Sequence, residues 1–437
     1  MSSYITKKTA GDTAWFTHDR FGMFIHFGLY SMPARHEWIK AEEKISEEHY
    51  DKYFKYFNPD LFDAEKWAKK AKKAGMKYAV LTAKHHEGFC LFDSEYTDYK
   101  SVNTPARRDF VKEFVEAFRA EGIKVGLYYS VIDWHHPDYQ IDIFHPLRTS
   151  ADAQEQNKVR DMKKYKEYVF NQVREILTNY GKIDIIWFDF TYPSLESIRN
   201  EYNEIFIKDY KEWMSWTDKE TWGSEELVKM IRSINPDIII NDRLGIPQDV
   251  TTPEQSIPTS WPLYQGTQEK AVWEACHTFS GSWGYHRDEM SWKTPDALIR
   301  TLITCVSKGG NLIMNVGPTS RGAFDERADR ALGEYEKWMK YNSRSIYGCT
   351  MAEPEFKAPV GSLLTQSEDG KRLYIHLVQY PFSELVMENL SGKIDYLQFL
   401  HDGSEIAFRE SNDGSVSVLV PELKPDCIIP VIEVMLA

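Results

Sequence analysis

Short apolar segments alternate along most of the chain with stretches that have the spacing of amphipathic helices. Repeated strand and helix units predict parallel strands covered by helices, because a parallel pair needs a long crossover connection. Weaker strands near Glu254 and Glu274 bring the expected number towards eight, which favours an α/β fold of the (β/α)8-like barrel type over an open doubly wound sheet. The stronger segments are residues 21–28, 78–86, 124–130, 183–190, 237–243 and 309–318.

Each of these strands ends in polar or charged side chains. The carboxyl ends of barrel strands meet at one rim, where active sites form. This regularity predicts that the chain is an enzyme. The residues concerned are His26, Lys84, His85, His86, Tyr128, Asp189, Arg243 and Asn315.

After Tyr347 the pattern changes to short alternating segments separated by turn sequences such as EDGKR, LSGK, HDGSE and SNDGS. This is typical of antiparallel strands. We therefore expect a catalytic barrel over residues 1–347 and a C-terminal antiparallel β-sandwich over residues 348–437.

Charge and composition narrow the range of partners. The net charge of −13 and the lack of a basic stripe argue against a nucleic-acid partner. No stretch of about 18 apolar residues occurs, so we expect no membrane partner either. The N-terminal sequence has no apolar run suited to a secretory signal, which favours a cytoplasmic location, although a leader removed earlier would leave the same sequence. The five scattered cysteines are typical of free, mostly buried thiols. A homo-oligomer is a further possible partner arrangement, which the sequence does not decide.

Three carboxyl groups are candidates for acid–base or nucleophilic chemistry. Asp189 ends an apolar strand, where it could attack a bound substrate, cap a helix or pair with an arginine. A glycosidase needs a second carboxyl group to protonate the leaving oxygen. Glu254 lies in a polar segment that could reach over the site, whereas Glu274 follows Trp273 in an apolar run and fits a structural role better. We prefer Glu254.

The histidine pairs do not form a spaced metal motif. His85 and His86 are adjacent, so within a strand they would face opposite sides, which argues against one shared metal. His135 and His136 also lack spaced partners. The sequence has no HExxH motif, no glycine-rich phosphate loop and no nucleophile elbow. We therefore expect no metal and no cofactor.

Several longer motifs, taken in order over residues ~15–350, resemble the α-L-fucosidases of glycoside hydrolase family 29. They are WFTHDRFGMFIHFGLYSMPARHEWI, KYAVLTAKHHEGFCLFDS, KVGLYYSVIDWHHPDY, IDIIWFDF, IINDR, TTPEQ, WEACHTFSGSWGY and GGNLIMNVGPTSRG. The resemblance implies a (β/α)8-like catalytic domain, a C-terminal β-sandwich and a retaining mechanism without cofactor. It also implies fucosylated oligosaccharides or glycoconjugates as substrates.

Matched position by position, the resemblance assigns roles to individual residues. Asp189 matches the nucleophile, and Glu254 matches the acid/base, whose surrounding loop varies in the family. Four positions depart from common family residues, namely Phe27 for Trp, Ile39 for Tyr, Glu87 for Asp and Phe190 for Gly. The sugar-binding positions are His26, Glu37, Trp38, His85, His86, Tyr128 and Arg243, and the apolar pocket for the C6 methyl group is Phe24, Trp187 and Trp283.

The expected mechanism is double displacement, in which Asp189 attacks C1 while Glu254 protonates the leaving oxygen. Arg243 would help to keep Asp189 ionised. Three alternatives remain at this stage. They are a carbohydrate-binding protein that has lost turnover, a metal-dependent hydrolase that uses the histidine pairs, and the same mechanism on a related sugar such as an α-L-galactoside.

Overall fold

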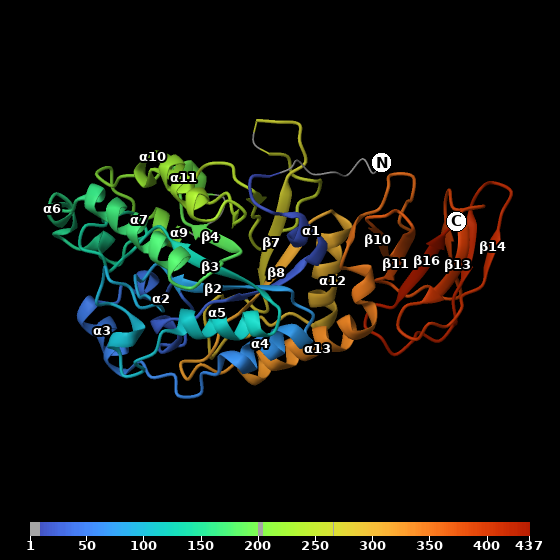
Figure 1. The fold of residues 1–437 in the computed structure, drawn as a ribbon, viewed down its shortest axis with the longest axis horizontal. Helices are drawn as coiled ribbons and strands as arrows, with labels where there is room; N and C mark the ends of the chain where they lie inside the picture. The colour runs from blue at the N-terminus through green and yellow to red at the C-terminus, as the bar shows by residue number, and fades with distance from the viewer. Residues whose placement is uncertain (1–8, 200–203, 265) are drawn as a thin grey trace.

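The computed structural model describes residues 9–199, 204–264 and 266–437. Its larger part is built on eight parallel strands in the order β5-β4-β3-β2-β1-β8-β7-β6 (Figure 1). A single parallel bridge between Asn241 and Val250 joins the two ends of this order, so the sheet nearly closes into a barrel. The strands are β1 (Phe21–Ile25), β2 (Tyr78–Lys84), β3 (Lys124–Ser130), β4 (Ile185–Asp189), β5 (Ile239–Ile240), β6 (Val250–Thr251), β7 (Val272–Thr278) and β8 (Asn311–Val316).

Helices cover the outside of this sheet, and several of them begin at a side-chain cap. Asp63, Asp109 and Thr294 each accept a hydrogen bond from a backbone N–H in the first turn of the helix that follows. The helices are α1 (Ala14–Asp19), α2 (Ile39–Glu42), α3 (Glu47–Tyr56), α4 (Ala64–Lys73), α5 (Phe110–Ala120), α6 (Ala153–Asn157), α7 (Met162–Thr178), α8 (Leu195–Arg199), α9 (Glu204–Ile207), α10 (Lys219–Trp222), α11 (Ser224–Ile234), α12 (Pro295–Ser307) and α13 (Glu326–Asn342).

The strands are buried on both faces, as parallel strands in a barrel must be. Along β2, Tyr78 and Val80 point into the barrel, where they pack with Phe24, Tyr128 and Trp187. Ala79 and Leu81, which alternate with them along the strand, belong to the large cluster that joins the sheet to the helices. The continuous apolar strands of the sequence therefore reflect two buried faces.

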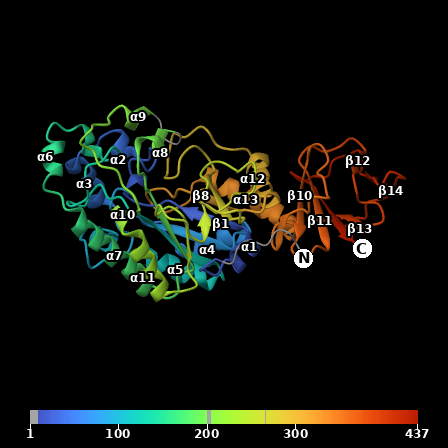
Figure 2. The same ribbon diagram turned by 90° about the horizontal axis from the view of Figure 1, so that it is seen from above.

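Two antiparallel sheets follow the barrel and lie at one end of an elongated molecule (Figure 2). Their order is β13-β16-β11-β10-β9 in one and β12-β15-β14 in the other. They enclose a second apolar cluster that includes Leu373, Ile375 and Val418. The strands are β9 (Cys349–Met351), β10 (Ser362–Ser367), β11 (Arg372–Leu377), β12 (Glu384–Met387), β13 (Ile394–Phe399), β14 (Phe408–Glu410), β15 (Val416–Leu419) and β16 (Val431–Leu436).

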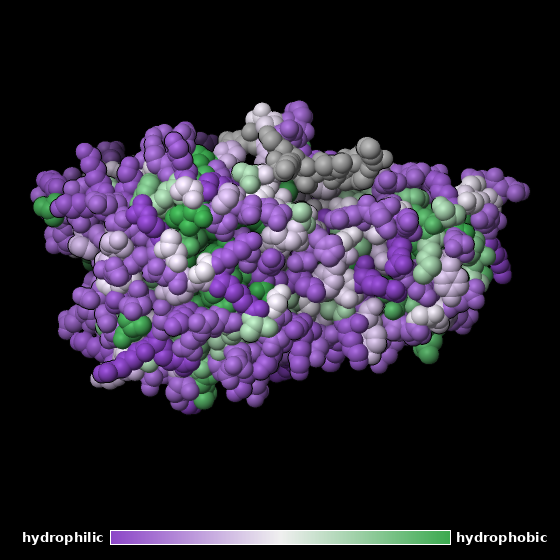
Figure 3. Space-filling view, in the orientation of Figure 1, coloured by the Kyte–Doolittle hydropathy of each residue, from purple (hydrophilic) through white to green (hydrophobic). Residues whose placement is uncertain are grey.

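The C-terminal sheets contact the barrel directly. The Trp338 indole N–H on α13 donates to the carbonyl of Ile429 at 3.0 Å, and Arg344 pairs with buried Glu433 at 2.9 Å. The face of the molecule seen in Figure 3 is mainly hydrophilic, with smaller hydrophobic areas over the barrel and over the C-terminal strands. The boundary between residues 347 and 348 remains our proposal for the domain division.

The fold confirms the predicted barrel and β-sandwich, with shorter strands than expected. The apolar segment at residues 21–28 forms a strand only to Ile25, and the segment at residues 78–86 only to Lys84. The polar residues at these ends have left the sheet to line the rim. No disulfide joins the five cysteines, and no helix in the described part of the chain is both long and apolar enough to span a bilayer. The expectation about a leader sequence rests partly on residues 1–8, which lie outside the described ranges.

Candidate active site

A pocket of about 30 Å³, which we call the small pocket, lies at the carboxyl ends of the barrel strands. Eleven of the twelve residues singled out from the sequence line it, together with Cys276. Arg243, the twelfth, lies beside it and contacts two of its members. The lining residues are Phe24, His26, Glu37, Trp38, His85, His86, Tyr128, Trp187, Asp189, Glu254, Cys276 and Trp283.

Asp189 is the last residue of β4 and points into the small pocket. Its Oδ1 accepts from Arg243 Nη1 at 3.0 Å, and its Oδ2 accepts from the Tyr128 hydroxyl at 2.8 Å. His86 Nε2 lies 3.8 Å from the same Oδ2. Burial raises the pKa of Asp189 to about 6, although Arg243 acts in the opposite direction. The expected effect of Arg243 on Asp189 is therefore present but is outweighed by burial, and the carboxyl group is mostly ionised at neutral pH.

Glu254 meets Asp189 at a single guanidinium nitrogen. Arg243 Nη1 donates to Glu254 Oε2 at 2.7 Å as well as to Asp189 Oδ1. The two carboxylate oxygens can therefore be no further apart than the sum of two hydrogen-bond lengths. Glu254 reaches this position from the segment after β6, where it forms an isolated bridge with Cys276 of β7. Its side chain is partly exposed at the mouth of the small pocket.

Glu274 lies lower in the barrel. It pairs in register with Asn311, the first residue of β8, and accepts from the hydroxyl of Tyr78, the first residue of β2. It does not line the small pocket. Burial raises the pKa of Glu274 to about 8, so the group is mainly protonated at neutral pH. Its depth in the barrel separates it from Asp189, which ends β4 at the opposite rim.

The prediction that His85 and His86 face opposite sides of a strand is wrong. Strand β2 ends at Lys84, so neither histidine is bound by strand alternation, and both line the small pocket with ring centroids 4.0 Å apart. His86 Nδ1 bonds the Ser130 hydroxyl at 2.7 Å. Burial lowers the pKa of both histidines well below the ordinary value, so they act as neutral hydrogen-bonding groups.

A second, larger cavity of about 690 Å³ opens beside the small pocket, and we call it the wide cavity. Glu254 lines both. The walls combine aromatic, hydroxyl and carboxyl side chains, and the cavity is open to solvent on one side. Its lining residues are Phe190, Thr191, Tyr192, Ser197, Asp242, Arg243, Gly245, Thr252, Pro253, Glu254, Gln255 and Ser256.

Comparison with known proteins identifies the family. The alpha-L-fucosidase family model matches residues 4–344. The chain belongs to this family. It is a glycoside hydrolase, in agreement with the carboxylate pair at the barrel rim.

Known alpha-L-fucosidases match this chain over most of their own length. The alpha-L-fucosidase of Dictyostelium discoideum is 30% identical over 369 residues, which cover 76% of this chain and 71% of that protein. The human tissue alpha-L-fucosidase is 26% identical over 449 residues, which cover 95% of this chain and 86% of that protein.

Solved structures show the same architecture. Alpha-L-fucosidase isoenzyme 1 from Paenibacillus thiaminolyticus superimposes with a TM-score of 0.86 at 42% identity, covering 97% of this chain and 98% of that one. An alpha-L-fucosidase of family GH29 from Bacteroides thetaiotaomicron, trapped as a covalent intermediate with 2-fluoro-fucosyl fluoride, gives 0.81 at 28% identity. That match covers 100% of this chain and 98% of the other.

Phe190, one of the departures from common family residues, has a left-handed backbone with φ 86°. Such a conformation favours glycine and costs other residues about 1–3 kcal/mol. The ring is buried and packs against His86, Phe144 and Tyr192, with centroid distances of 4.7, 4.6 and 4.7 Å. This packing holds the strained residue in place directly after Asp189 and puts an aromatic wall between the small pocket and the wide cavity.

A buried ion pair supports the histidine segment from behind. Lys84 Nζ lies 3.1 Å from Asp133 Oδ2, and both side chains are almost fully buried. Asp133 Oδ1 also accepts from the backbone N–H groups of His135 and His136. Burial raises the pKa of Asp133, but Lys84, His136 and His135 together outweigh this effect, so the net pKa is lowered. The pair therefore joins the end of β2 to the loop after β3.

We expect Asp133→Asn to lower the free energy of unfolding by about 3–5 kcal/mol, because it leaves the Lys84 ammonium group buried without a counter-ion. Urea denaturation of the purified proteins measures this. The double variant Lys84→Met with Asp133→Asn removes the unpaired charge and should recover much of the loss. A single variant within 1 kcal/mol of the wild type would contradict the assignment.

Two residues of the site were not assigned a role from the sequence. Cys276 lines the small pocket, and the alternation of β7 could have indicated this, because Cys276 lies two residues after inward-facing Glu274. Asn315 was noted only as a polar strand end. It bonds both His26 and the backbone of Trp283.

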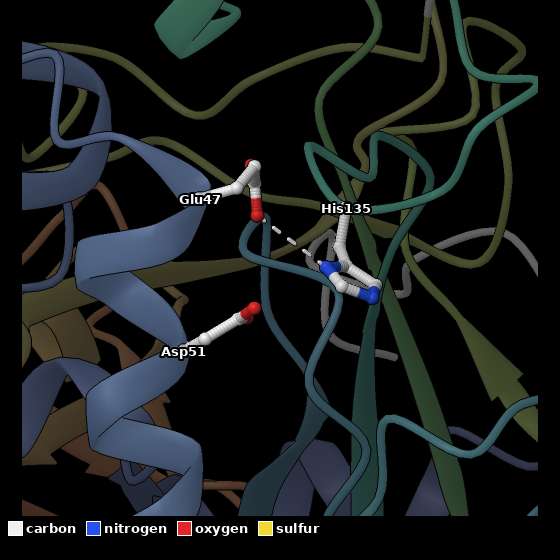
Figure 4. Close-up of side chains that lie close together, drawn as sticks. All are labelled: Glu47, Asp51 and His135. Atoms are coloured by element: carbon white, nitrogen blue, oxygen red, sulfur yellow. Dashed lines mark ion pairs between the residues drawn. The ribbon is translucent and has the colours of Figure 1, made fainter.

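A group of possible metal ligands lies outside both cavities. Carboxylate oxygens of Glu47 and Asp51 on α3 and a ring nitrogen of His135 all lie within 4.8 Å of one another (Figure 4). Glu47 already pairs with the buried ammonium group of Lys40 at 2.9 Å and with His135 Nδ1 at 3.5 Å. A cation here would compete with Lys40, so we interpret the group as an ion-pair network and assign no metal to it.

Proposed function

We propose that the chain is a retaining exo-α-L-fucosidase, with Asp189 as nucleophile and Glu254 as acid/base. The observation that carries the proposal is the shared contact of both carboxylates with Arg243 Nη1 at the mouth of the small pocket. Retaining glycosidases hold their two carboxyl groups about 5–5.5 Å apart, and inverting ones about 6.5–9.5 Å. One nitrogen bonded to both carboxylates favours the shorter separation. The covalent intermediate trapped in the Bacteroides thetaiotaomicron relative supports the same mechanism.

In the first step, an Asp189 oxygen forms a bond to C1 of the sugar while the bond from C1 to the leaving oxygen breaks. The electron pair of that bond stays on the leaving oxygen, which takes the proton from Glu254. In the second step, Glu254 removes a proton from water as the water oxygen bonds to C1 and the ester bond to Asp189 breaks. Two inversions at C1 retain its configuration.

The polar lining of the small pocket suits the ring hydroxyl groups of one sugar. The neutral histidines His26, His85 and His86 can each donate and accept. Among the described residues, the buried Nδ1 of His85 has no hydrogen-bond partner, and a sugar hydroxyl would supply one. Further polar contacts would come from Glu37, Trp38, Tyr128 and Arg243.

The wide cavity suits the leaving group. It begins at Glu254, where the proton is transferred, and its volume is that of a site for a ligand much larger than one ring. Tyr192 and Phe190 line it with aromatic side chains, and Asp242 and Gln255 add polar side chains to its wall. This supports fucosylated oligosaccharides or glycoconjugates as substrates.

The proposal is tested by incubating the enzyme with 4-nitrophenyl α-L-fucoside and following the released sugar by proton NMR. We expect α-L-fucose as the first-formed anomer. Release of the β anomer would overturn retention, and no release would favour a sugar-binding protein. Faster release from the α-L-galactoside would shift the assignment to that sugar.

Phe24, Trp187 and Trp283 form the apolar part of the small pocket, with Phe24 ring centroids 5.1 Å from Trp187 and 6.0 Å from Trp283. We expect Trp283→Ala to reduce the preference for the fucoside over the L-galactoside, because a methyl-sized difference in an apolar pocket is worth about 1–3 kcal/mol. The measurement is kcat/KM on both aryl glycosides.

Trp292→Ala is the control for this substitution, because Trp292 lies outside the small pocket and should leave the preference unchanged. An equal loss on both sugars in Trp283→Ala would show that Trp283 does not contact the methyl group.

A further inference from the structure

Asn315 is a buried amide that joins two parts of the small pocket. It lies near the carboxyl end of β8, paired in register with Phe24 of β1 and Thr278 of β7, and is 2% exposed. Its Nδ2 donates to the backbone carbonyl of Trp283 at 2.6 Å, and its Oδ1 lies 2.6 Å from His26 Nδ1. Both bonds run to residues that line the small pocket.

The direction of these two bonds follows from the chemistry of their ends. A carbonyl oxygen only accepts hydrogen bonds, so the group that faces Trp283 must be the amide NH2 of Asn315. Its carbonyl oxygen therefore faces His26, and it too can only accept. His26 must then carry its proton on Nδ1. In a neutral imidazole the other nitrogen, Nε2, is left with a lone pair and acts as an acceptor.

We propose that Asn315 is a positioning residue that fixes His26 in the Nδ1–H tautomer, so that Nε2 accepts a hydrogen bond from a hydroxyl group of the bound sugar. This inference rests on the proposed function, in which His26 contacts the sugar. It fixes the direction of one hydrogen bond, in which the sugar hydroxyl donates and His26 Nε2 accepts. A substrate with a hydroxyl donor at that position fits, and a substrate that can only accept there does not.

The surroundings of His26 support a neutral ring. The side chain is 4% exposed and is packed against Phe24 at 4.7 Å and Trp283 at 5.2 Å between ring centroids. Burial lowers the pKa of His26 to about 3, with the bond to Asn315 acting in the opposite direction. The imidazole therefore keeps one ring proton over the neutral pH range.

The same amide also holds Trp283 in place. The segment that carries Trp283 has a second anchor one residue later, because Gly284 N–H donates to buried Glu37 Oε2 at 2.7 Å. Loss of Asn315 would thus leave this segment attached through Glu37, while His26 would be free to exchange tautomers. The effect of Asn315 on His26 can therefore be separated from a general loss of structure.

The direct test is the tautomer of His26 in the wild-type enzyme. Protein labelled with 15N in the histidine rings is examined by two-bond proton–nitrogen correlation, and the His26 signals are assigned by their loss in His26→Gln. We expect the pattern of a neutral ring protonated on Nδ1. An Nε2-protonated ring or an imidazolium would overturn the proposal. This measurement does not depend on turnover or on any variant at position 315.

The second test is Asn315→Leu, with Asn311→Leu as matched control. Asn311 is a buried amide on the same strand, but it bonds the carbonyl of Phe16 and lies outside the small pocket. We expect Asn315→Leu to mix the two His26 tautomers and to raise KM for the aryl fucoside about tenfold with a smaller change in kcat. The control should keep the wild-type tautomer and KM.

Substrate analogues connect the tautomer to the sugar. In the wild type, replacing the hydroxyl that bonds His26 by fluorine should raise KM by the same factor as replacing it by hydrogen, because fluorine cannot donate a hydrogen bond. In a set of singly deoxy and deoxyfluoro aryl fucosides, one position should show this equality, and its cost should shrink in Asn315→Leu. If no position does so in an active wild-type enzyme, the inference fails while the proposed function stands. If the wild type releases no fucose, the proposed function fails.

Discussion

Asp189→Ala should leave a folded protein whose kcat/KM on 4-nitrophenyl α-L-fucoside is lower than that of the wild type by a factor of about 10⁴ or more. The reason is that the substitution removes the oxygen that forms the covalent bond to C1. The Tyr128 hydroxyl, which donates to this carboxylate at the end of β4, would then lose that partner, while Arg243 would keep its bond to Glu254. Circular dichroism confirms folding, and initial rates give the loss.

Azide distinguishes the loss of a nucleophile from general damage. The space left by the Asp189 carboxylate can admit azide, which should restore part of the rate and yield β-fucosyl azide. Asp242→Ala is the matched control, because Asp242 is also a carboxylate close after a barrel strand, yet it bonds Thr252 and lines the wide cavity and not the small pocket. It should keep most of the activity and show no azide product. Turnover near the wild-type level in Asp189→Ala would exclude Asp189 as nucleophile.

The barrel was predictable because its strands are buried on both faces and therefore stand out as apolar runs between amphipathic helices. The prediction was least accurate where strands are short. β5 and β6 contain two residues each, and the sheet closes there through one bridge between Asn241 and Val250. Such a closure depends on packing around the whole ring and leaves almost no local pattern.

The site residues at strand ends were also predictable, because alternation and the common rim of a barrel bring them together. Loops follow no such period. The expected placement of His85 and His86 on opposite sides of a strand was wrong, because the strand ends at Lys84. The buried ion pair of Lys84 with Asp133 then joins the end of β2 to the loop after β3. The bonds of Asn315 to His26 and Trp283 join residues far apart in the sequence, and no local signal indicates them.

The family resemblance carried the residue roles further than the patterns did. From the residues alone, Glu254 and Glu274 differed only in the polarity of their surroundings. The structure adds a physical difference, since Glu254 shares Arg243 with Asp189 whereas Glu274 bonds Tyr78 near the opposite end of the strands. The role of Glu254 as acid/base is still a proposal, and a kinetic experiment can decide it.

Glu254→Ala should greatly slow the hydrolysis of fucosyl oligosaccharides and slow that of aryl fucosides much less. A sugar alkoxide is a poor leaving group that needs a proton, and general acid catalysis is worth about 10²–10⁴-fold. A nitrophenolate leaves without one. Comparing kcat/KM on a fucosyl disaccharide and on 4-nitrophenyl α-L-fucoside measures the difference. Glu274→Ala is the control, and it should affect both substrates alike.

The second chemical step gives an independent readout for Glu254. Without a base to activate water, the fucosyl-enzyme should accumulate with aryl substrates, giving a burst of nitrophenolate. Azide needs no base, so it should speed the breakdown of this intermediate and yield α-fucosyl azide. The anomer is the opposite of that expected for Asp189→Ala, because azide here attacks the enzyme-bound sugar from the other face.

The pH profile of kcat/KM is a third test of Glu254 as the acid/base. Asp189 must be ionised to attack, and its pKa of about 6 places the acid limb there, with activity falling as the pH falls below that value. The basic limb reports loss of the proton from the acid. Glu254→Ala should therefore flatten the basic limb and leave the acid limb in place. If the flattened limb and the leaving-group dependence both appear in Glu274→Ala instead, the buried carboxyl group on β7 is the acid and Glu254 only holds Arg243.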